Sequence, residues 1–414
     1  MKVKRVCVIG MGYIGLPTAT LIASRGFSVT GVDVKQEVVN TINQGKIHIV
    51  EPDLDWQVKR VVESGHLTAV LSPVEADVFV IAVPTPFKGD HQPDITYVEK
   101  ATLAIAPFLR EGNLVILEST SPVGTTEHIA SLIDEARPDL KQTGGLFIAY
   151  CPERVLPGQI MRELIENDRI VGGIDAESTQ KVADFYRLFV TGKVVETSAR
   201  TAEMTKLTEN SFRDVNIAFA NELAMVCEEL NVNVWDVIAM ANLHPRVNIL
   251  RPGPGVGGHC IAVDPWFIVA QAPQQARIIR QAREINDSMP DRVVQKVKDA
   301  LGQKGLTVER ATIACLGLAY KANVDDMRES PAVQVTERLA HLGTHRLLAV
   351  EPHVTALPAE LEGLSNVQLS SLDEALERSD LVVILVDHND FKDKFRAVQL
   401  DVPVVDTRGI VAVK

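Results

Sequence analysis

The chain has 414 residues, of which 46% are hydrophobic, and a formal net charge of −12. This length and hydrophobic content suffice for two or three domains with cores of their own. The acidic balance repels nucleic acid and anionic membranes, so both are excluded as main partners. The five cysteines are scattered without zinc-site spacing, which is typical of a reducing compartment. The sequence shows no signal-peptide pattern and no apolar run near the roughly 20 residues of a membrane span, so we expect a cytoplasmic protein.

The first 200 residues alternate short apolar segments with stretches of helical periodicity. The apolar segments are rich in Val and Ile and bounded by Gly, Pro or Asp, which is typical of buried strands. They are Val6–Ile9, Val29–Asp33, Val78–Pro84, Leu114–Ser119 and Phe147–Tyr150. Helical periods such as Pro17–Arg25 and Val98–Leu109 fill the gaps. This alternation predicts a doubly wound parallel sheet.

The middle of the chain follows a different pattern. From about Arg200 to Leu230 there is no Gly or Pro, which predicts one long helix, followed by shorter helices to about Gly302. Strand signals then return at Ala311–Leu316, Arg346–Val350, Leu381–Val386 and Val402–Asp406. We therefore predict an α/β protein with two Rossmann-like doubly wound domains joined by a long central helix and helical connector. The predicted domains are 1–199, 200–302 and 303–414.

A glycine motif, Gly10-Met11-Gly12-Tyr13-Ile14-Gly15, follows the first expected strand and opens a helix. Its glycines allow a tight turn, close approach of the backbone to a pyrophosphate, and close helix–strand packing. Asp33 ends the next strand, where its carboxylate can accept hydrogen bonds from a ribose diol and would repel a 2′-phosphate. The pattern favours NAD over NADP, while FAD or a purely structural glycine turn stay as alternatives.

Two further loops follow expected strands of the same sheet. Thr85 lies in a Val-Pro-Thr-Pro segment, and Thr120 and Thr126 lie in the segment 119–126. Ligands bind at this edge of an open α/β sheet, so these hydroxyls are candidates for contacts with the cofactor. Ordinary loop chemistry and helix capping explain any single threonine equally well.

The segment 252–260, PGPGVGGHC, places four glycines just before Cys260. A bare backbone lets a substrate approach closely, and a thiolate there can attack an aldehyde. Asp264 follows four residues later and supports a catalytic interpretation. A buried structural thiol is the alternative for Cys260, as it is for Cys7 and Cys315 within apolar strands.

The long central helix carries a polar stripe, because Lys206, Asn210 and Arg213 recur at helical spacing. A neighbouring and mostly apolar stripe, Met204, Thr208, Phe212, Val215 and Phe219, is the expected core face. A polar stripe beside a core stripe is usually a solvated surface, and that alternative stays open. Glu153, in a Cys-Pro-Glu-Arg segment that ends a strand, is a candidate base; the alternative is a capping or salt-bridging residue.

Six motifs together resemble the UDP-glucose/GDP-mannose 6-dehydrogenase family over nearly the whole chain. They are GxGYxGLP, STSPVGTT, CPERVLPG, TAEMTKLTENSFRDVNIAFANE, PGPGVGGHCIAVDP and GLAYKANVDDMRESPA, in that order. Within the family, the spellings IVEPDL, PTPFKGDHQPD, HPRVNI and DPWFIVAQ are closest to members that act on UDP-N-acetyl-D-mannosamine.

The resemblance implies an NAD-dependent, four-electron oxidation of a UDP-sugar at C6. Cys260 would capture the aldehyde as a thiohemiacetal, and the second oxidation would give a thioester that water releases as the uronate. Lys206 and Asn210 match oxyanion-stabilising residues, Glu153 matches the candidate base for hydrolysis, and Asp264 matches a residue that orients the lysine and water. No metal is implied.

The resemblance also implies substrate contacts and an assembly. The residues that would line the sugar-nucleotide site are Arg154, Val155, Lys206, Asn210, Arg213, His244, Arg246, Gly257, Tyr320, Lys321 and Arg408. Arg328 would approach the NAD end. Arg246 would act across the interface of a homodimer, or of a dimer-based homo-oligomer, formed by the connector domain. The single glycine turn at Gly317 fits UDP in the last domain better than a second NAD. A surface-glycan pathway is implied by resemblance alone.

Several alternatives stay open. UDP-N-acetylglucosamine or UDP-glucose would undergo the same chemistry. A two-electron dehydrogenase of the 6-phosphogluconate or hydroxyacid type has a similar layout, but would not need Cys260 in a glycine loop. A non-catalytic sensor of NAD and nucleotide sugar is a further class, against which the set of Lys206, Cys260 and Asp264 argues. One NADH per sugar would indicate a two-electron enzyme, and two would indicate a 6-dehydrogenase.

Overall fold

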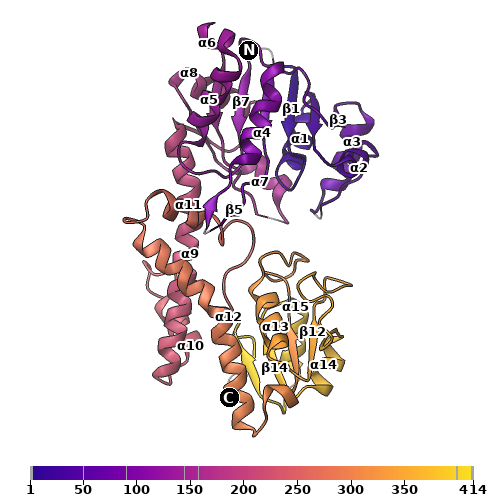
Figure 1. The fold of residues 1–414 in the computed structure, drawn as a ribbon, viewed down its shortest axis with the longest axis vertical. Coiled ribbons are helices and arrows are strands. Elements are labelled where there is room, and N and C mark those ends of the chain that lie inside the picture. Colours follow the sequence, from indigo (N-terminus) through magenta and orange to yellow (C-terminus); the bar gives the residue numbers. More distant parts are fainter. Residues whose placement is uncertain are drawn as a thin grey trace. The chain divides into compact units, whose positions relative to one another are not determined.

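The structure is a computed structural model that describes residues 3–49, 51–89, 91–143, 145–156, 158–397 and 400–411. The chain divides into two compact units, Met1–Glu209 and Asn210–Lys414 (Figure 1). The long helix α9, Ala199–Glu229, begins in the first unit and continues into the second. The predicted three-domain division stays a prediction. Among the helices in the described ranges, none combines the length and apolarity that crossing a membrane requires.

The first unit is built on an eight-stranded sheet with the order β10-β9-β8-β7-β4-β1-β2-β3. Its strands are β1 Arg5–Ile9, β2 Ser28–Val32, β3 Leu67–Val70, β4 Val78–Ile81, β7 Leu114–Leu117, β8 Phe147–Tyr150, β9 Arg169–Gly173 and β10 Val194–Ser198. All neighbours are parallel except β8 and β9, which run antiparallel. The five strands predicted in this part of the chain are present, whereas β3, β9 and β10 were not predicted.

Helices cover both faces of this sheet, which is why its central strands are buried on both sides. One face packs against α1 Gly15–Ser24, α2 Gln36–Asn43, α3 Leu54–Glu63, α7 Ile160–Glu166 and α8 Ala176–Tyr186. The other face packs against α4 Thr96–Ile105 and α5 Thr125–Ala136. The short elements are the hairpin β5 Phe87–Lys88 and β6 Gln92–Pro93, the 3₁₀ turn Ala106–Phe108, and α6 Pro138–Thr143. This is the predicted doubly wound arrangement.

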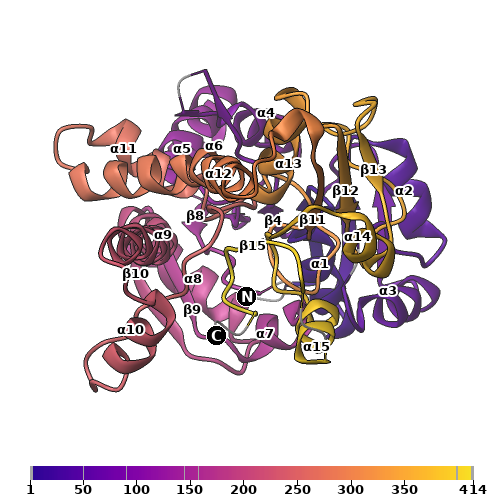
Figure 2. The same cartoon turned by 90° about the horizontal axis from the view of Figure 1, so that it is seen from below.

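The second unit carries a parallel five-stranded sheet with the order β13-β12-β11-β14-β15. Its strands are β11 Thr312–Leu316, β12 Arg346–Val350, β13 Val367–Leu369, β14 Leu381–Ile384 and β15 Val404–Asp406. Helices α12 Arg277–Gln303 and α13 Pro331–His341 pack on one face, and α14 Leu372–Arg378 and α15 Asn389–Ala397 pack on the other (Figure 2). The remaining elements are α10 Val234–Ala241, α11 Asp264–Gln271 and the 3₁₀ turn Val308–Arg310. A second Rossmann-like domain was predicted here, with four of these strands.

The prediction for the faces of the central helix was wrong. Phe212 and Phe219, expected in the core, are 68% and 52% exposed, and Met204 is exposed as well. Lys206 and Asn210, for which a solvated surface was the alternative, are buried, although Arg213 is exposed. Helical periodicity identifies a stripe but not what covers it, because that depends on which segments pack against the helix.

Glu118, which directly follows β7, is one of several buried carboxyl groups of the first unit. Glu118 is buried and accepts hydrogen bonds from the Tyr186 hydroxyl at 2.6 Å and the Thr18 hydroxyl at 3.3 Å. Burial raises the pKa of Glu118 to about 7; the nearby Arg169 opposes this rise and the nearby Glu153 adds to it. Glu118 is therefore about half protonated in the folded protein at pH 7 and largely protonated below that pH.

This protonation predicts a pH-dependent stability. The folded-state pKa of Glu118, about 7, lies above its ordinary value of 4.5. The stabilisation is fully present below the unfolded pKa and is lost as pH rises through about 7. We expect Glu118 to lower the free energy of unfolding by up to about 3 kcal/mol between these limits, and Glu118→Gln to abolish that decrease. Urea unfolding of both proteins at pH 5 and pH 8 measures this, and the same pH dependence in both would contradict a neutral Glu118.

Candidate active site

The glycine motif forms a tight turn between β1 and α1. Gly10 has a φ of +91°, and a Cβ at Gly15 would lie 1.7 Å from the Gly10 carbonyl oxygen. These two glycines are therefore required by the packing of strand against helix. A Cβ at Gly12 would meet no atom within 4 Å, so the protein's own packing does not require this glycine. No side chain caps the N-terminus of α1, which leaves its N–H groups available to a pyrophosphate.

Asp33 follows β2 and holds this turn. Its Oδ2 accepts a hydrogen bond from the Met11 N–H at 3.1 Å, and its Oδ1 accepts one from the Lys35 N–H at 2.9 Å. Each carboxylate oxygen has a further lone pair, so the side chain can bind the turn and still accept from a ribose diol. The geometry of the turn thus fits a dinucleotide.

The predicted threonines tie neighbouring loops together. The Thr85 hydroxyl donates to the Thr120 carbonyl oxygen at 2.5 Å, which joins the loops after β4 and β7. The Thr126 hydroxyl is buried and donates to Glu203 Oε1 at 2.6 Å. Glu203 also accepts from the N–H groups of Gly124 and Thr126, so it occupies the N-terminus of α5. A cofactor contact of Thr126 stays a prediction, and its hydroxyl already has a structural partner.

Glu153 follows β8 and is paired with a buried arginine that sequence reasoning missed. Its Oε2 accepts from Arg169 Nη1 at 2.9 Å, and the two side chains are 6% and 3% exposed. Its Oε1 accepts from the Arg154 backbone N–H at 2.6 Å. The Arg154 side chain forms an ion pair with Glu209 at 2.6 Å, while the neighbouring Val155 packs against the core of this unit. An arginine at the start of an apolar strand gives no functional signal in a single sequence.

In the second unit, the glycines before Cys260 are required by packing within the protein. A Cβ at Gly257 would lie 2.4 Å from the Glu329 carbonyl oxygen and 2.7 Å from Pro331 Cδ. A Cβ at Gly258 would lie 3.1 Å from the ring of Tyr320, and that residue has a φ of +82°. The sequence suggested that these glycines admit a substrate. The structure gives a different reason, because the loop 320–331 occupies the space that side chains would fill.

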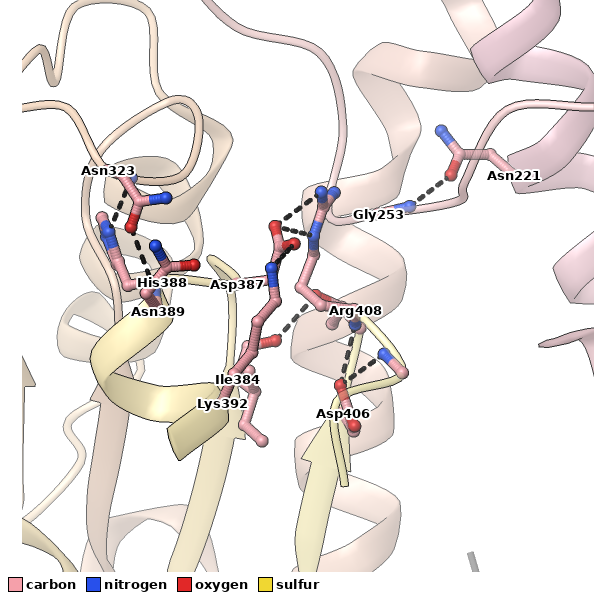
Figure 3. A network of polar contacts seen from close by, with 12 residues as sticks. Asn221, Gly253, Asn323, Ile384, Asp387, His388, Asn389, Lys392, Asp406 and Arg408 are labelled. Atoms are coloured by element: carbon pink, nitrogen blue, oxygen red, sulfur yellow. Dashed lines mark hydrogen bonds and ion pairs between the residues drawn. The ribbon is translucent and has the colours of Figure 1, made fainter. Parts of the chain in front are cut away.

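The start of the glycine loop is held by a chain of buried polar groups. The Gly253 N–H donates to Asn221 Oδ1 at 2.8 Å (Figure 3), and Asn221 Nδ2 donates to Asn286 Oδ1 at 2.8 Å. Asn286 Nδ2 in turn donates to Asp214 Oδ1 at 2.8 Å, which also accepts from Arg283 Nη1 at 2.7 Å. Because Asp214 and Asn221 lie on α9 and the other two on α12, the network fixes the loop to both helices.

Cys260, Asp264 and Asn210 are brought together. The Asp264 N–H donates to the Cys260 carbonyl oxygen at 2.8 Å, so the cysteine lies one turn before the start of α11. Asn210 Nδ2 donates to Asp264 Oδ2 at 2.5 Å, and both of these side chains are buried. Lys206 lies one helical turn before Asn210 on α9.

Cys260 also differs from the other cysteines, all of which lie in the described ranges. It is exposed, whereas Cys7, Cys151, Cys227 and Cys315 are buried. Burial raises the pKa of Cys7 to about 11 and the pKa values of Cys151 and Cys315 to about 12. These three thiols are therefore poor nucleophiles at neutral pH.

The loop that carries Tyr320 and Lys321 is held in place by hydrogen bonds to Glu351 and His388. Glu351 Oε2 accepts from the N–H groups of Leu318 and Ala319 at 2.8 and 2.9 Å. His388 Nδ1 accepts from the Asn323 N–H at 3.0 Å (Figure 3). Its Nε2 lies 3.1 Å from Glu351 Oε2.

This arrangement also bears on metal binding. Glu351, His353 and His388 lie close enough together to resemble a metal site. However, a ring nitrogen that accepts from an N–H carries no proton, so the proton of neutral His388 lies on Nε2 and is donated to Glu351. The one ring lone pair of His388 is therefore used by the Asn323 N–H and is not available to a metal ion, and the cluster positions the loop that carries Tyr320 and Lys321 instead.

Arg408 has a buried acidic partner beside the glycine loop. Its Nε and Nη2 donate to Asp387 Oδ1 at 3.1 and 2.9 Å (Figure 3). Asp387 also accepts from Lys392 Nζ at 2.7 Å. A Cβ at Gly253 would lie 2.5 Å from Arg408 Nη1. The guanidinium thus lies against the start of the glycine loop.

The other predicted site residues are less constrained. Arg213, His244 and Arg246 are exposed on this chain, and Arg328 pairs with Asp326 at 2.7 Å. Within the second unit the structure thus gathers Asn210, Cys260 and Asp264 in one place, and Gly257 with Tyr320 in another. The residues that sequence reasoning missed are Glu118, Arg169, Glu203, Asp387 and His388. All but Glu118 contact predicted site residues or the loops that carry them, and Glu118 accepts from Tyr186, against whose ring Arg169 stacks.

Comparison with known proteins shows to which family domains these parts of the chain belong. Models of the UDP-glucose/GDP-mannose dehydrogenase family match the chain in three segments: the NAD binding domain at residues 4–190, the central domain at 200–288 and the UDP binding domain at 314–413. The glycine turn and Asp33 lie in the first segment, Cys260 in the second and Arg408 in the third. NAD is therefore the cofactor.

Relatives match over nearly the whole length. UDP-N-acetyl-D-mannosamine dehydrogenase of Escherichia coli K12 is 58% identical over 402 residues, which cover 95% of each chain. NDP-N-acetyl-D-galactosaminuronic acid dehydrogenase of Ralstonia solanacearum is 54% identical and covers 99% of this chain and 97% of its own. Among solved structures, the UDP-D-ManNAc dehydrogenase of Pyrococcus horikoshii matches with a TM-score of 0.89 at 39% identity, covering 99% of this chain and 96% of its own. The chain belongs to the UDP-glucose/GDP-mannose dehydrogenase family and is an NAD-dependent UDP-sugar dehydrogenase.

Proposed function

We propose that this enzyme oxidises UDP-N-acetyl-D-mannosamine at C6 to the uronate, in two hydride transfers with Cys260 as covalent catalyst. Bound NAD supplies the chemistry of hydride acceptance. The observation that carries the proposal is the exposed Cys260 at the end of a packed glycine loop. The chain is also 58% identical to the Escherichia coli relative named UDP-N-acetyl-D-mannosamine dehydrogenase. Cys7, Cys151 and Cys315 are poor replacements, because burial raises the pKa of each of these thiols and disfavours the thiolate.

The reaction balances in four steps. Removal of a hydride from C6 and a proton from its hydroxyl gives an aldehyde, to which the Cys260 thiol adds to form a thiohemiacetal. Loss of a second hydride and a proton gives the thioester. Water then attacks the thioester carbonyl, the C–S bond breaks, and the uronate leaves while Cys260 recovers its thiol. A covalent thiol holds the reactive carbonyl between the two oxidations.

The negative charge that develops on the C6 oxygen would be stabilised by Lys206 and Asn210, with Asp264 as the residue that orients them. A buried ammonium and an amide N–H are donors that stabilise an oxyanion in a site from which water is excluded. The hydrogen bond between Asn210 and Asp264 supports a shared role, since it fixes the orientation of the amide. Glu153 is assigned to accept the proton of the hydrolytic water.

The nucleotide is assigned to the cationic and aromatic residues of the second unit. Lys321, Arg408 and Arg213 would neutralise the diphosphate, and Tyr320 would contact the nucleotide, which reconciles an acidic chain with an anionic substrate. The exposure of Phe212, Phe219 and Leu243, the last beside His244 and Arg246, supports a homodimer in which a second copy covers this face. In that arrangement Arg246 would serve the partner's site.

The identity of the sugar is the part of the proposal that a substrate panel tests. We expect the highest kcat/KM with UDP-N-acetylmannosamine and two NADH per sugar. UDP-N-acetylgalactosamine belongs in the panel because of the Ralstonia relative, together with UDP-N-acetylglucosamine and UDP-glucose. Preference for another of these sugars would overturn the assignment of the sugar, and one NADH per sugar would overturn the four-electron chemistry.

Replacing the nucleophile gives a direct test of covalent catalysis. Cys260→Ala should lower uronate formation by a factor on the order of 10³ or more, because no thiohemiacetal can form. Binding of the UDP-sugar, measured by calorimetry, should change little. Cys227→Ala, which removes a buried thiol from α9, is the matched control and should retain activity. Wild-type turnover in the Cys260 variant would refute the mechanism.

Asp33 separates the two binding functions. Asp33→Ala should raise the KM for NAD by roughly 10- to 100-fold, because hydrogen bonds to a charged acceptor contribute about 1.5–3 kcal/mol. The KM for the UDP-sugar should stay near its wild-type value. Asp33→Asn, which keeps one carbonyl acceptor, should have an intermediate effect. Initial-rate measurements with each substrate varied decide this, and equal losses for both would argue against a ribose contact.

A further inference from the structure

Arg169 lies in a buried cluster that has one cation and two carboxyl groups. Its guanidinium is 3% exposed, forms the ion pair with Glu153 at 2.9 Å, and stacks 5.4 Å from the centre of the Tyr186 ring. Its other terminal nitrogen donates to the Leu164 carbonyl oxygen at 3.3 Å. Tyr186 donates in turn to Glu118. The guanidinium is thus held from several sides, and its direction is fixed before any ligand arrives.

The charges of this cluster balance when Glu118 is protonated. Arg169 and ionised Glu153 then form a neutral pair, whereas ionised Glu118 would add an uncompensated negative charge to a buried site. Burial favours the protonated form of Glu118, and the ion pair of Arg169 is formed with Glu153. Glu153 also accepts from the Arg154 N–H through its other oxygen, so both of its oxygens are fixed by donors.

We propose that Arg169 is a positioning residue for the hydrolytic step, which it serves by holding the Glu153 carboxylate in the orientation that accepts the proton of the attacking water. This inference rests on the proposed function. A carboxylate oxygen has more than one lone pair, so Glu153 can accept from Arg169 and still accept from water. The water oxygen bonds to the thioester carbonyl, its proton passes to Glu153, and the C–S bond to Cys260 breaks. Arg169 contacts neither the substrate nor the cofactor in this scheme.

The test uses the full-length enzyme with NAD and UDP-N-acetylmannosamine, followed by rapid quenching and mass spectrometry. Arg169→Lys keeps the positive charge but loses the planar guanidinium with its several N–H donors in fixed directions. In this variant we expect a rapid burst of two NADH per active site. Steady-state turnover should then be 10- to 100-fold slower than in the wild type. The peptide that contains Cys260 should carry the acyl adduct. The ratio kcat/KM should change less than twofold for either substrate, because it does not include the later hydrolytic step. Glu153→Gln should stall in the same way.

Two further variants separate positioning from stability. Arg137→Lys is the control, since Arg137 donates to the carbonyl oxygens of Ala106 and Leu109 and to Asp139, away from Glu153; no adduct should accumulate. The double variant Arg169→Met with Glu153→Gln removes both buried charges and should be no slower than Glu153→Gln alone, because Arg169 acts through Glu153.

Each outcome decides the question. Accumulation of the adduct in both Arg169→Lys and Glu153→Gln supports the proposal, as does a double variant that matches Glu153→Gln. If Glu153→Gln accumulates the adduct while Arg169→Lys hydrolyses it at the wild-type rate, or loses hydride transfer and hydrolysis in proportion, the positioning role is overturned. If quenched wild type and Glu153→Gln both lack any adduct on Cys260, the covalent route fails, and this inference fails with it.

Discussion

The close approach of the loop 320–331 to the segment before Cys260 is the constraint on which the second unit depends. Glu329, Pro331 and Tyr320 occupy the space that side chains at Gly257 and Gly258 would fill. Cys260 therefore lies at the end of a loop whose path is set by packing against the segment 320–331. The same loop carries Tyr320 and Lys321, so the groups assigned to the nucleotide and to the chemistry are joined by direct packing.

Buried ion pairs hold the other parts of the site in place. Arg283 with Asp214 fixes α12 to α9, and Arg169 at the start of β9 pairs with Glu153, which follows β8. The pair of Arg408 with Asp387, which is only part-buried, lies beside Gly253. Burying a charge is costly unless it is paired with an opposite charge. The main effect of each pair is therefore to favour one arrangement of the segments that carry it, and its net contribution to stability is small. In a chain of net charge −12, these acidic partners also hold arginines in defined orientations.

The two sheets use one device at the same place in their topology. Asp33 follows the second strand of the first sheet and accepts from the N–H of the turn after β1, while Glu351 follows β12 and accepts from the turn after β11. In the first sheet the turn carries the full glycine motif and belongs to the NAD binding domain. In the second it has the single Gly317, with a φ of +93°, and belongs to the UDP binding domain. In both sheets the acidic side chain thus holds the turn by accepting its N–H groups. The glycine content of the turn differs between the NAD binding domain and the UDP binding domain.

The sequence by itself determined the α/β class, the strands with continuous Val and Ile runs, the glycine turn with Asp33, and the motifs around Cys260. These features are local: each is a spacing or a run that strand, turn and helix geometry require. The partly exposed strand β10 and the burial of Lys206 and Asn210 were decided by tertiary structure, as were the pairing of Arg169 with Glu153 and the protonation of Glu118. Those properties depend on which segments distant in sequence cover a given side chain, because burial and the distance between charges are set by packing and not by spacing along the chain.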